Sequence, residues 1–180
     1  KVMEQYSHYE YGELLANKLK PISHTPEHPH FFTAFGFEDL FGFEDKLSNV
    51  TGMVLIAVDG MESESSDNNG DGLTDRNEYS FIVARNTNSS RPETINQAAL
   101  DCKVIAKQIR NRLFHDPTLK YSISRTTRIN GIGPIGDNFY GVVLTFSLRE
   151  PEDFFINSDF CQKNFRFLCK KGALLQLEGP

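Results

Sequence analysis

The sequence MVLIAVDGMESESSDNNGDGLTDRNEYSFIVA at residues 53–84 is the main guide to the architecture of this protein. Residues 53–58 and 79–84 are runs of β-branched, aromatic and other apolar residues, each about as long as a typical strand. Between them lies a polar, acidic segment rich in Asn, Asp and Gly, which are the residues that tight turns select. The pattern predicts two β-strands joined as a hairpin with an acidic tip.

The tip of this hairpin also has the spacing of a twelve-residue calcium loop. Residues 67–78 read DNNGDGLTDRNE, and Gly72 stands where such a loop needs a sharp turn. The oxygen-bearing side chains at loop positions 1, 3, 5, 9 and 12 are Asp67, Asn69, Asp71, Asp75 and Glu78. An EF-hand requires helices on both sides, whereas strands are expected here, so an unliganded hairpin tip is the competing interpretation. Calcium is the one cofactor that the sequence suggests.

A long helix is expected after the hairpin, because apolar residues recur every three or four positions from Ile95 to Leu113. Pro92 suits the first turn of this helix, and Cys102 lies on its apolar stripe, where a buried thiol is expected. The opposite side of the helix is basic. Its positive residues are Lys103, Lys107, Arg110 and Arg112.

A second hairpin is expected from residues 119–129 and 139–148, which are strand-like, with the turn-rich NGIGPIGD at 130–137 between them. Together with an amphipathic helix at 1–20, these elements predict an α+β fold. We expect an antiparallel sheet of about four strands in two hairpins, with the long helix packed on one face. We expect a single domain over 1–180, with its core in 49–150 and a C-terminal extension at 151–180.

Residues 21–48 are expected to form a linker followed by a Phe-rich loop. The linker is rich in Pro and His and is predicted to be extended and mobile, and a metal site built from His24, His28 and His30 is the less favoured alternative to a solvated linker. The Phe-rich loop contains FGFED twice, at 35–39 and at 41–45. Exposed aromatic patches mark interfaces, so the candidate interface residues are Phe35, Phe37, Phe41 and Phe43, although the protein's own core is an alternative cover for them.

Composition narrows the classes of function. The chain has 180 residues with 39% hydrophobic and 24% charged content, typical of a globular domain, and it has no apolar run long enough for a membrane span. Three cysteines without a CxxC pair favour a reducing compartment, and no secretory leader is expected at the N-terminus. No catalytic constellation has convincing spacing, so an enzyme is not expected. The overall acidity argues against specific binding of nucleic acid.

Charge is shared unevenly between the two halves of the chain. Residues 1–90 carry 15 acidic and 6 basic side chains, whereas residues 91–180 carry 9 acidic and 13 basic ones. Such asymmetry suits head-to-tail association of identical subunits, although a solvated surface is an equally simple explanation.

The order hairpin, long helix, hairpin over residues 45–150 resembles the tail-terminator and head–tail connector class of tailed-phage virion proteins. The sequences SDNNGDGLTD (66–75) and GPIGDNFYGVVLTF (133–146) are similar to uncharacterised proteins of phages and prophages of Bacteroides-like bacteria. The resemblance implies a ring-forming structural subunit whose partners are identical subunits and other neck or tail proteins. It also implies location in the virion, assembled in the host cytoplasm, with a lumen that lets DNA pass, and it carries over no active-site residues.

Two other classes of function compete with this expectation. A secreted or surface calcium-dependent binding module is suggested by the acidic tip, although the unpaired thiols argue against it. An enzyme with a dispersed active site is the third class, because a single sequence does not reveal such a site. Oligomeric state separates the three, since only the virion subunit is expected to form a large ring.

Overall fold

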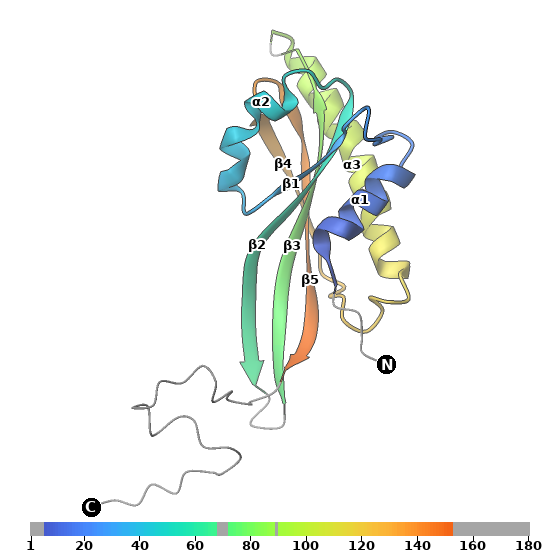
Figure 1. Cartoon of the computed structure of the whole chain (residues 1–180), viewed down its shortest axis with the longest axis vertical. Coiled ribbons are helices and arrows are strands. Elements are labelled where there is room, and N and C mark those ends of the chain that lie inside the picture. The colour runs from blue at the N-terminus through green and yellow to red at the C-terminus, as the bar shows by residue number, and fades with distance from the viewer. Residues whose placement is uncertain (1–5, 68–71, 89, 153–180) are drawn as a thin grey trace, which may run out of the picture.

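The computed structural model describes residues 6–67, 72–88 and 90–152, and it shows a long twisted sheet with helices on both of its faces (Figure 1). The helices are α1 (His8–Lys18), the short 3-10 helix η1 (Glu38–Gly42), α2 (Phe43–Leu47) and α3 (Pro92–His115). The strands are β1 (Phe31–Ala34), β2 (Met53–Asp67), β3 (Leu73–Asn86), β4 (Arg128–Ile135) and β5 (Phe139–Glu152). The α+β class, the first hairpin and the long helix are therefore confirmed.

The sheet has five strands in the order β1-β2-β3-β5-β4, one more than expected. The additional strand, β1, is parallel to β2, whereas every other pair of neighbours is antiparallel. β1 lies in the segment that was expected to be linker and loop. It has only four residues, and Gly36 follows closely with a φ of 74°, so its sequence does not stand out from that of a loop. The sheet is mixed because the chain returns through η1 and α2 before entering β2.

The second hairpin is shifted along the chain from its expected position. The turn-rich residues of 130–137 are mostly in β4, and the turn itself is at 136–138. Residues 119–125, expected to be a strand, instead form turns with one isolated bridge from Ile123 to Leu148. β4 lies at the edge of the sheet, where a strand needs a hydrogen-bonded neighbour on one side only. An edge position tolerates the glycines and the proline that made this segment look like a turn.

The Pro- and His-rich segment is a hydrogen-bonded turn, which corrects the expected extended linker. The Nδ1 atom of His30 donates to the carbonyl oxygen of Ile22 at 2.7 Å, and the backbone N–H of His30 donates to Nδ1 of His24 at 3.0 Å. Ile22 is buried in the core beneath this turn. Two of the histidines thus close the turn, and the described residues contain no group of three side chains that could hold a metal ion.

The core has two layers, one on each face of the sheet. On one face, α1 and α3 pack against alternate strand residues such as Leu55 and Phe81. On the other face, α2 packs against the intervening residues, such as Ile56 and Ile82. Figure 1 shows α1 and α3 together on one side of the strands and α2 on the other. Because successive strand residues point to opposite faces, the continuous apolar runs in β2 and β3 are those of strands covered on both sides.

Gly141 allows β5 to approach β3 closely at the centre of the sheet. A Cβ atom at this position would overlap the carbonyl oxygen of Val83 and lie 2.7 Å from Cα of Ala84. No side-chain rotamer can relieve contacts with backbone atoms. A glycine is therefore required here, and the strand pairing of the core depends on it.

Beyond the helices, three of the strands continue as an extension that we call the polar arm. It consists of residues 62–67 of β2, 73–78 of β3 and 149–152 of β5. The arm begins after a shift in register between Val58 and Glu62, where Met61 has a φ of 55°. In Figure 1 these strand ends extend past both helical layers. All the side chains of residues 62–67 are exposed, so the arm adds little to the core.

Candidate functional site

Exposed apolar side chains gather in the Phe-rich segment and at the bulge of β2, where the body of the sheet meets the polar arm. We call this group the aromatic shoulder, and its members are Phe35, Phe37, Phe41 and Met61, which are 64%, 41%, 87% and 69% exposed. Phe37 lines a small notch together with Gly60, the neighbour of Met61. Large apolar side chains that are exposed together are typical of a surface that another molecule covers.

The Phe-rich segment of the aromatic shoulder is held by one hydrogen bond to the sheet and by one within the segment itself. The N–H of Gly36 donates to the carbonyl oxygen of Asp59 at 3.2 Å, which ties the Phe-rich segment to the bulge of β2. The N–H of Phe35 donates to a carboxylate oxygen of Asp39 at 3.2 Å, which closes the turn that enters η1. The exposed rings are thus attached to a defined backbone.

Phe43 does not belong to this surface, although it was expected there. Its side chain is fully buried in the core layer under α2, beside Ile135 and Phe139. The two FGFED repeats therefore have different roles, because only the second one begins a helix that packs on the sheet. Of the four candidate interface residues, Phe35, Phe37 and Phe41 are exposed.

The surroundings of the aromatic shoulder are acidic. The exposed carboxylates of η1 and α2 are those of Glu38, Asp39, Glu44 and Asp45. The base that follows them, Lys46, places its ammonium group 4.3 Å from the centre of the Phe43 ring. This segment therefore combines an apolar surface with negative charge.

The structure separates the described members of the predicted calcium set. Asn69 and Asp71 lie outside the described residues, whereas Asp67, Asp75 and Glu78 are in strands. Asp75 and Glu78 point to opposite faces of β3, because they are an odd number of positions apart and side chains alternate along a strand. Asp75 accepts a hydrogen bond from Ser65, and Glu78 lies 3.6 Å from the guanidinium of Arg128. These two carboxylates do not converge on one point.

The two faces of the polar arm differ in charge. The strand register places four acidic side chains and no base on the face that continues from α1 and α3, and these are Asp67, Asp75, Glu150 and Glu152. The opposite face mixes both signs, and its charged residues are Glu62, Glu64, Arg76, Glu78 and Arg149. Arg76 forms an ion pair with Glu64 there. The arm therefore presents one acidic face and one nearly neutral face.

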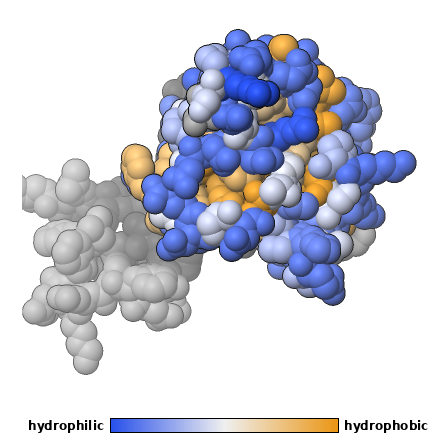
Figure 2. Space-filling model, turned by 90° about the horizontal axis from the view of Figure 1, so that it is seen from above, coloured by the Kyte–Doolittle hydropathy of each residue, from blue (hydrophilic) through white to orange (hydrophobic). Residues whose placement is uncertain are grey.

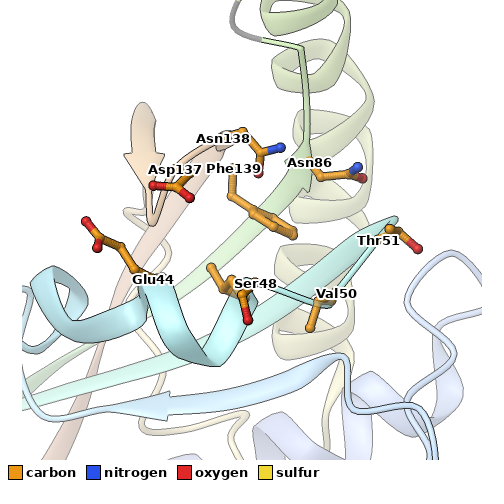
Figure 3. A pocket seen from close by; sticks show the side chains of 9 residues that line it. Glu44, Ser48, Val50, Thr51, Asn86, Asp137, Asn138 and Phe139 are labelled. Carbon is orange, nitrogen blue, oxygen red and sulfur yellow. The ribbon is translucent and has the colours of Figure 1, made fainter.

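A cavity of about 180 Å³ lies between α2, the loop before β2 and the β4–β5 turn (Figure 3). Figure 3 shows Asn86 and Asn138 at its wall, with the Phe139 ring below them. Both amides are engaged by the backbone: the Asn86 oxygen accepts from the N–H of Gly52 at 2.7 Å, and the Asn138 nitrogen donates to the Thr87 carbonyl at 3.1 Å. The cavity wall is thus part of the framework that joins the strands, and its amides have structural partners.

The first residue of α1, His8, is a buried histidine that the sequence did not single out. The Nε2 atom of His8 donates to the carbonyl oxygen of Ser80 at 2.9 Å, and Nδ1 accepts from the Tyr6 hydroxyl at 3.0 Å. Burial lowers the pKa of His8 to about 4 and outweighs the opposite effects of the Ser80 carbonyl and Asp59. His8 therefore anchors α1 as a neutral ring. Its spacing of four and eight residues from Gly12 and Ala16, which are also buried, was the available sequence signal.

Cys102 is buried, as the sequence predicted. Its side chain is fully covered between α3 and the sheet, and burial raises the pKa of its thiol to about 12. A nucleophilic cysteine needs a lowered pKa, so this residue acts as a small apolar core side chain.

No family model, curated protein or solved structure matches this chain. In the part of the chain that the structure describes, no helix combines the length and the apolar character that crossing a bilayer requires.

Proposed function

We propose that this chain is a structural subunit of a phage virion that forms or joins a ring at the neck or tail. The observation that carries the proposal is the polar arm. Residues 62–67 of β2 extend the sheet by about 20 Å at roughly 3.3 Å per residue, beyond the helices that cover the body. An extension that buries little of its own surface is suited to reaching a neighbouring subunit or an adjoining ring.

The charge on the arm supports the same proposal. Its acidic face carries Asp67, Asp75, Glu150 and Glu152 with no base among them. Such an acidic face repels the phosphates of DNA, whereas a protein that binds DNA lines its binding surface with Lys and Arg. A ring whose lumen includes this face would let DNA pass without specific binding.

The aromatic shoulder provides the second support, because exposed aromatic residues are enriched at protein–protein interfaces. In a ring, identical subunits and other neck or tail proteins are the partners that cover it. The rival classes of function gain no comparable support, since Asp75 and Glu78 face away from each other and the cavity amides are engaged by the backbone.

The first test is the mass and shape of the purified protein, measured by light scattering and by electron microscopy of negatively stained samples. We expect closed rings built from 20.4 kDa subunits. A matched variant replaces residues 63–77 with an Asn-Gly turn, which shortens the arm and leaves the body intact. This variant is expected to fold, but its rings are expected no longer to stack on the adjoining ring.

The second test locates the protein in the parent particle by antibody labelling. Label at the neck or tail is the expected result. A chain that is monomeric at every concentration and salt, and that is also absent from the particle, would exclude the proposal.

A further inference from the structure

The outward side of α3 carries a second exposed apolar surface. Leu100 and Val104 are 61% and 58% exposed and lie four residues apart, so they are neighbours on one side of the helix. Cys102 and Ala106, between and beyond them, face the sheet and are fully buried. Lys103 and Lys107 are exposed on the same outward side. We call Leu100, Lys103, Val104 and Lys107 the α3 ridge.

The α3 ridge and the aromatic shoulder lie on opposite sides of the sheet. α3 packs in the core layer that contains Leu55, whereas α2, which follows η1, packs in the layer that contains Ile56. Figure 1 shows η1 and α2 to the left of the strands and α3 to the right. Figure 2, viewed from above, shows hydrophobic residues reaching the surface on both of these sides. Within one molecule, the aromatic shoulder and the α3 ridge therefore cannot contact and cover each other.

The charges around the two surfaces are opposite. The ridge brings two ammonium groups, those of Lys103 and Lys107, beside its apolar side chains. The shoulder has two exposed carboxylates beside its rings in η1, those of Glu38 and Asp39. Complementary charge of this kind selects the partner and the orientation of an interface.

We propose that the aromatic shoulder of one copy packs against the α3 ridge of a second copy. The phenylalanine rings cover Leu100 and Val104, while the carboxylates of η1 approach the two lysines. This inference rests on the proposed function, because it identifies the contact through which the ring closes. Since each copy uses two different surfaces on opposite faces, the contact is heterologous and repeats around a ring.

A symmetric contact is disfavoured by the same charges. Shoulder against shoulder would bring Glu38 and Asp39 of both copies together, and ridge against ridge would bring the lysines together. Like charges placed across an interface weaken it. The head-to-tail arrangement is the one in which apolar side chains meet and unlike charges meet as well.

The experiment begins with one apolar substitution on each surface, Phe41→Asp and Val104→Asp. Both side chains are exposed, so the variants are expected to keep the circular dichroism and thermal midpoint of the wild type. Each variant alone should need at least about a tenfold higher concentration for half-assembly, as loss of a central apolar contact predicts. Tyr121→Ser removes an exposed ring that belongs to neither surface. This variant is the control and is expected to assemble as the wild type does.

Mixing the two variants tests the head-to-tail geometry. The Phe41→Asp protein keeps an intact ridge, and the Val104→Asp protein keeps an intact shoulder. We expect one-to-one dimers that stop at that size, because the two remaining surfaces of each dimer are both defective. Dimers formed by either variant alone would overturn the proposal.

Charge reversal tests the pairing of the two surfaces. Lys103→Glu with Lys107→Glu should raise the concentration for half-assembly, and so should Glu38→Lys. Combining these three changes in one chain should restore assembly to within about threefold of the wild type, since opposite charges face each other again. Lys20→Glu, an exposed reversal in the turn after α1, is the matched control.

Failure of this inference differs from failure of the proposed function. If wild-type rings form and all of these variants assemble as the wild type does, the shoulder–ridge contact is excluded and the ring remains. If the wild type neither assembles alone nor enters the particle, both proposals are excluded. If the wild type assembles only in the particle, the amount of each variant that is incorporated into the particle is measured in place of light scattering. The variants are expected to rank in the same order.

Discussion

The body of the sheet and the polar arm are built from the same three strands but placed in different surroundings. In the body, both faces of β2, β3 and β5 are covered, and side chains such as Ile56 and Phe81 are fully buried. In the arm, the same strands stay paired after the shift in register at the β2 bulge, and their side chains there are mostly Ser, Glu, Asp and Arg. Strand pairing therefore extends beyond the hydrophobic core, and the free energy of folding comes mainly from the body.

The change from body to arm occurs at the bulge in β2. The N–H of Met61 donates to the Asp59 side chain at 2.9 Å, and the register between β2 and β3 resumes at Glu62. A bulge reorients the side chains that follow it. Here it places Met61 on the aromatic shoulder and shifts the pairing of β2 with β3 for the arm, while each face of the arm continues a face of the body. Substitutions on the two sides of the bulge are expected to have very different effects.

The largest effect is expected from Gly141→Val in the body. The added side chain would overlap the backbone of β3 at Val83 and Ala84, which cannot yield without breaking strand pairing. We expect a loss of about 4 kcal/mol or more in the free energy of unfolding, or no folded protein. Urea denaturation followed by circular dichroism measures this.

The control for Gly141→Val is a substitution of the same kind in the arm. Ser66→Val adds a β-branched side chain to an exposed strand position and is expected to change stability by less than about 0.5 kcal/mol. Equal losses for the two variants would show that the arm is part of the cooperative core.

A second comparison uses the two phenylalanines of one FGFED repeat. Phe43→Ala removes a fully buried ring and should cost about 3 to 5 kcal/mol, whereas Phe41→Ala removes a ring that is 87% exposed and should cost less than about 0.5 kcal/mol. Urea denaturation of the monomer measures both. A large loss for Phe41→Ala in the monomer would mean that this ring is covered within its own chain.

The repeat also shows what the sequence can and cannot predict. Phe41 and Phe43 are two residues apart in the same motif, and the difference between them comes from Ile135 and Phe139, which are far away in the chain. Contacts of this kind leave no local signal. The sequence predicted α3 and the first hairpin because their periodicity is local and long. It missed β1, since four residues followed by a glycine turn resemble a loop.

The sequence predicted the candidate surfaces to different extents, because only some of their features depend on residues that are close together in the chain. The unusual composition of the Phe-rich segment marked it as a candidate surface, but it did not separate the exposed Phe35, Phe37 and Phe41 from the buried Phe43. The α3 ridge was predicted only as a basic side of the helix, because Leu100 and Val104 fall outside its apolar stripe and look like ordinary surface positions. The acidic face of the arm required the register, which fixes which carboxylates of β2, β3 and β5 share one side.

The next expected effect is a pH dependence that arises in the body. Because burial lowers the pKa of His8 to about 4 from its ordinary value of 6.5, the unfolded chain takes up a proton first as the pH falls. Stability is therefore lost between pH 6.5 and 4, by up to about 3 kcal/mol, and the loss is complete below that range. Urea midpoints of the wild type and of His8→Gln across this range give the difference. A pH slope that is unchanged in His8→Gln would contradict this prediction.

The smallest effect is expected from the ion pair of the arm. Arg76 and Glu64 face each other on the mixed-charge side, and their side chains are 50% and 68% exposed. Exposed pairs contribute little because water and salt screen them, so Arg76→Ala should lower the free energy of unfolding by less than about 1 kcal/mol. The difference from the wild type should vanish at about 1 M NaCl, where screening acts over about 3 Å. A loss that persists at high salt would mean that Arg76 stabilises the arm by packing of its side chain, which would make the arm more like the body than its exposure indicates.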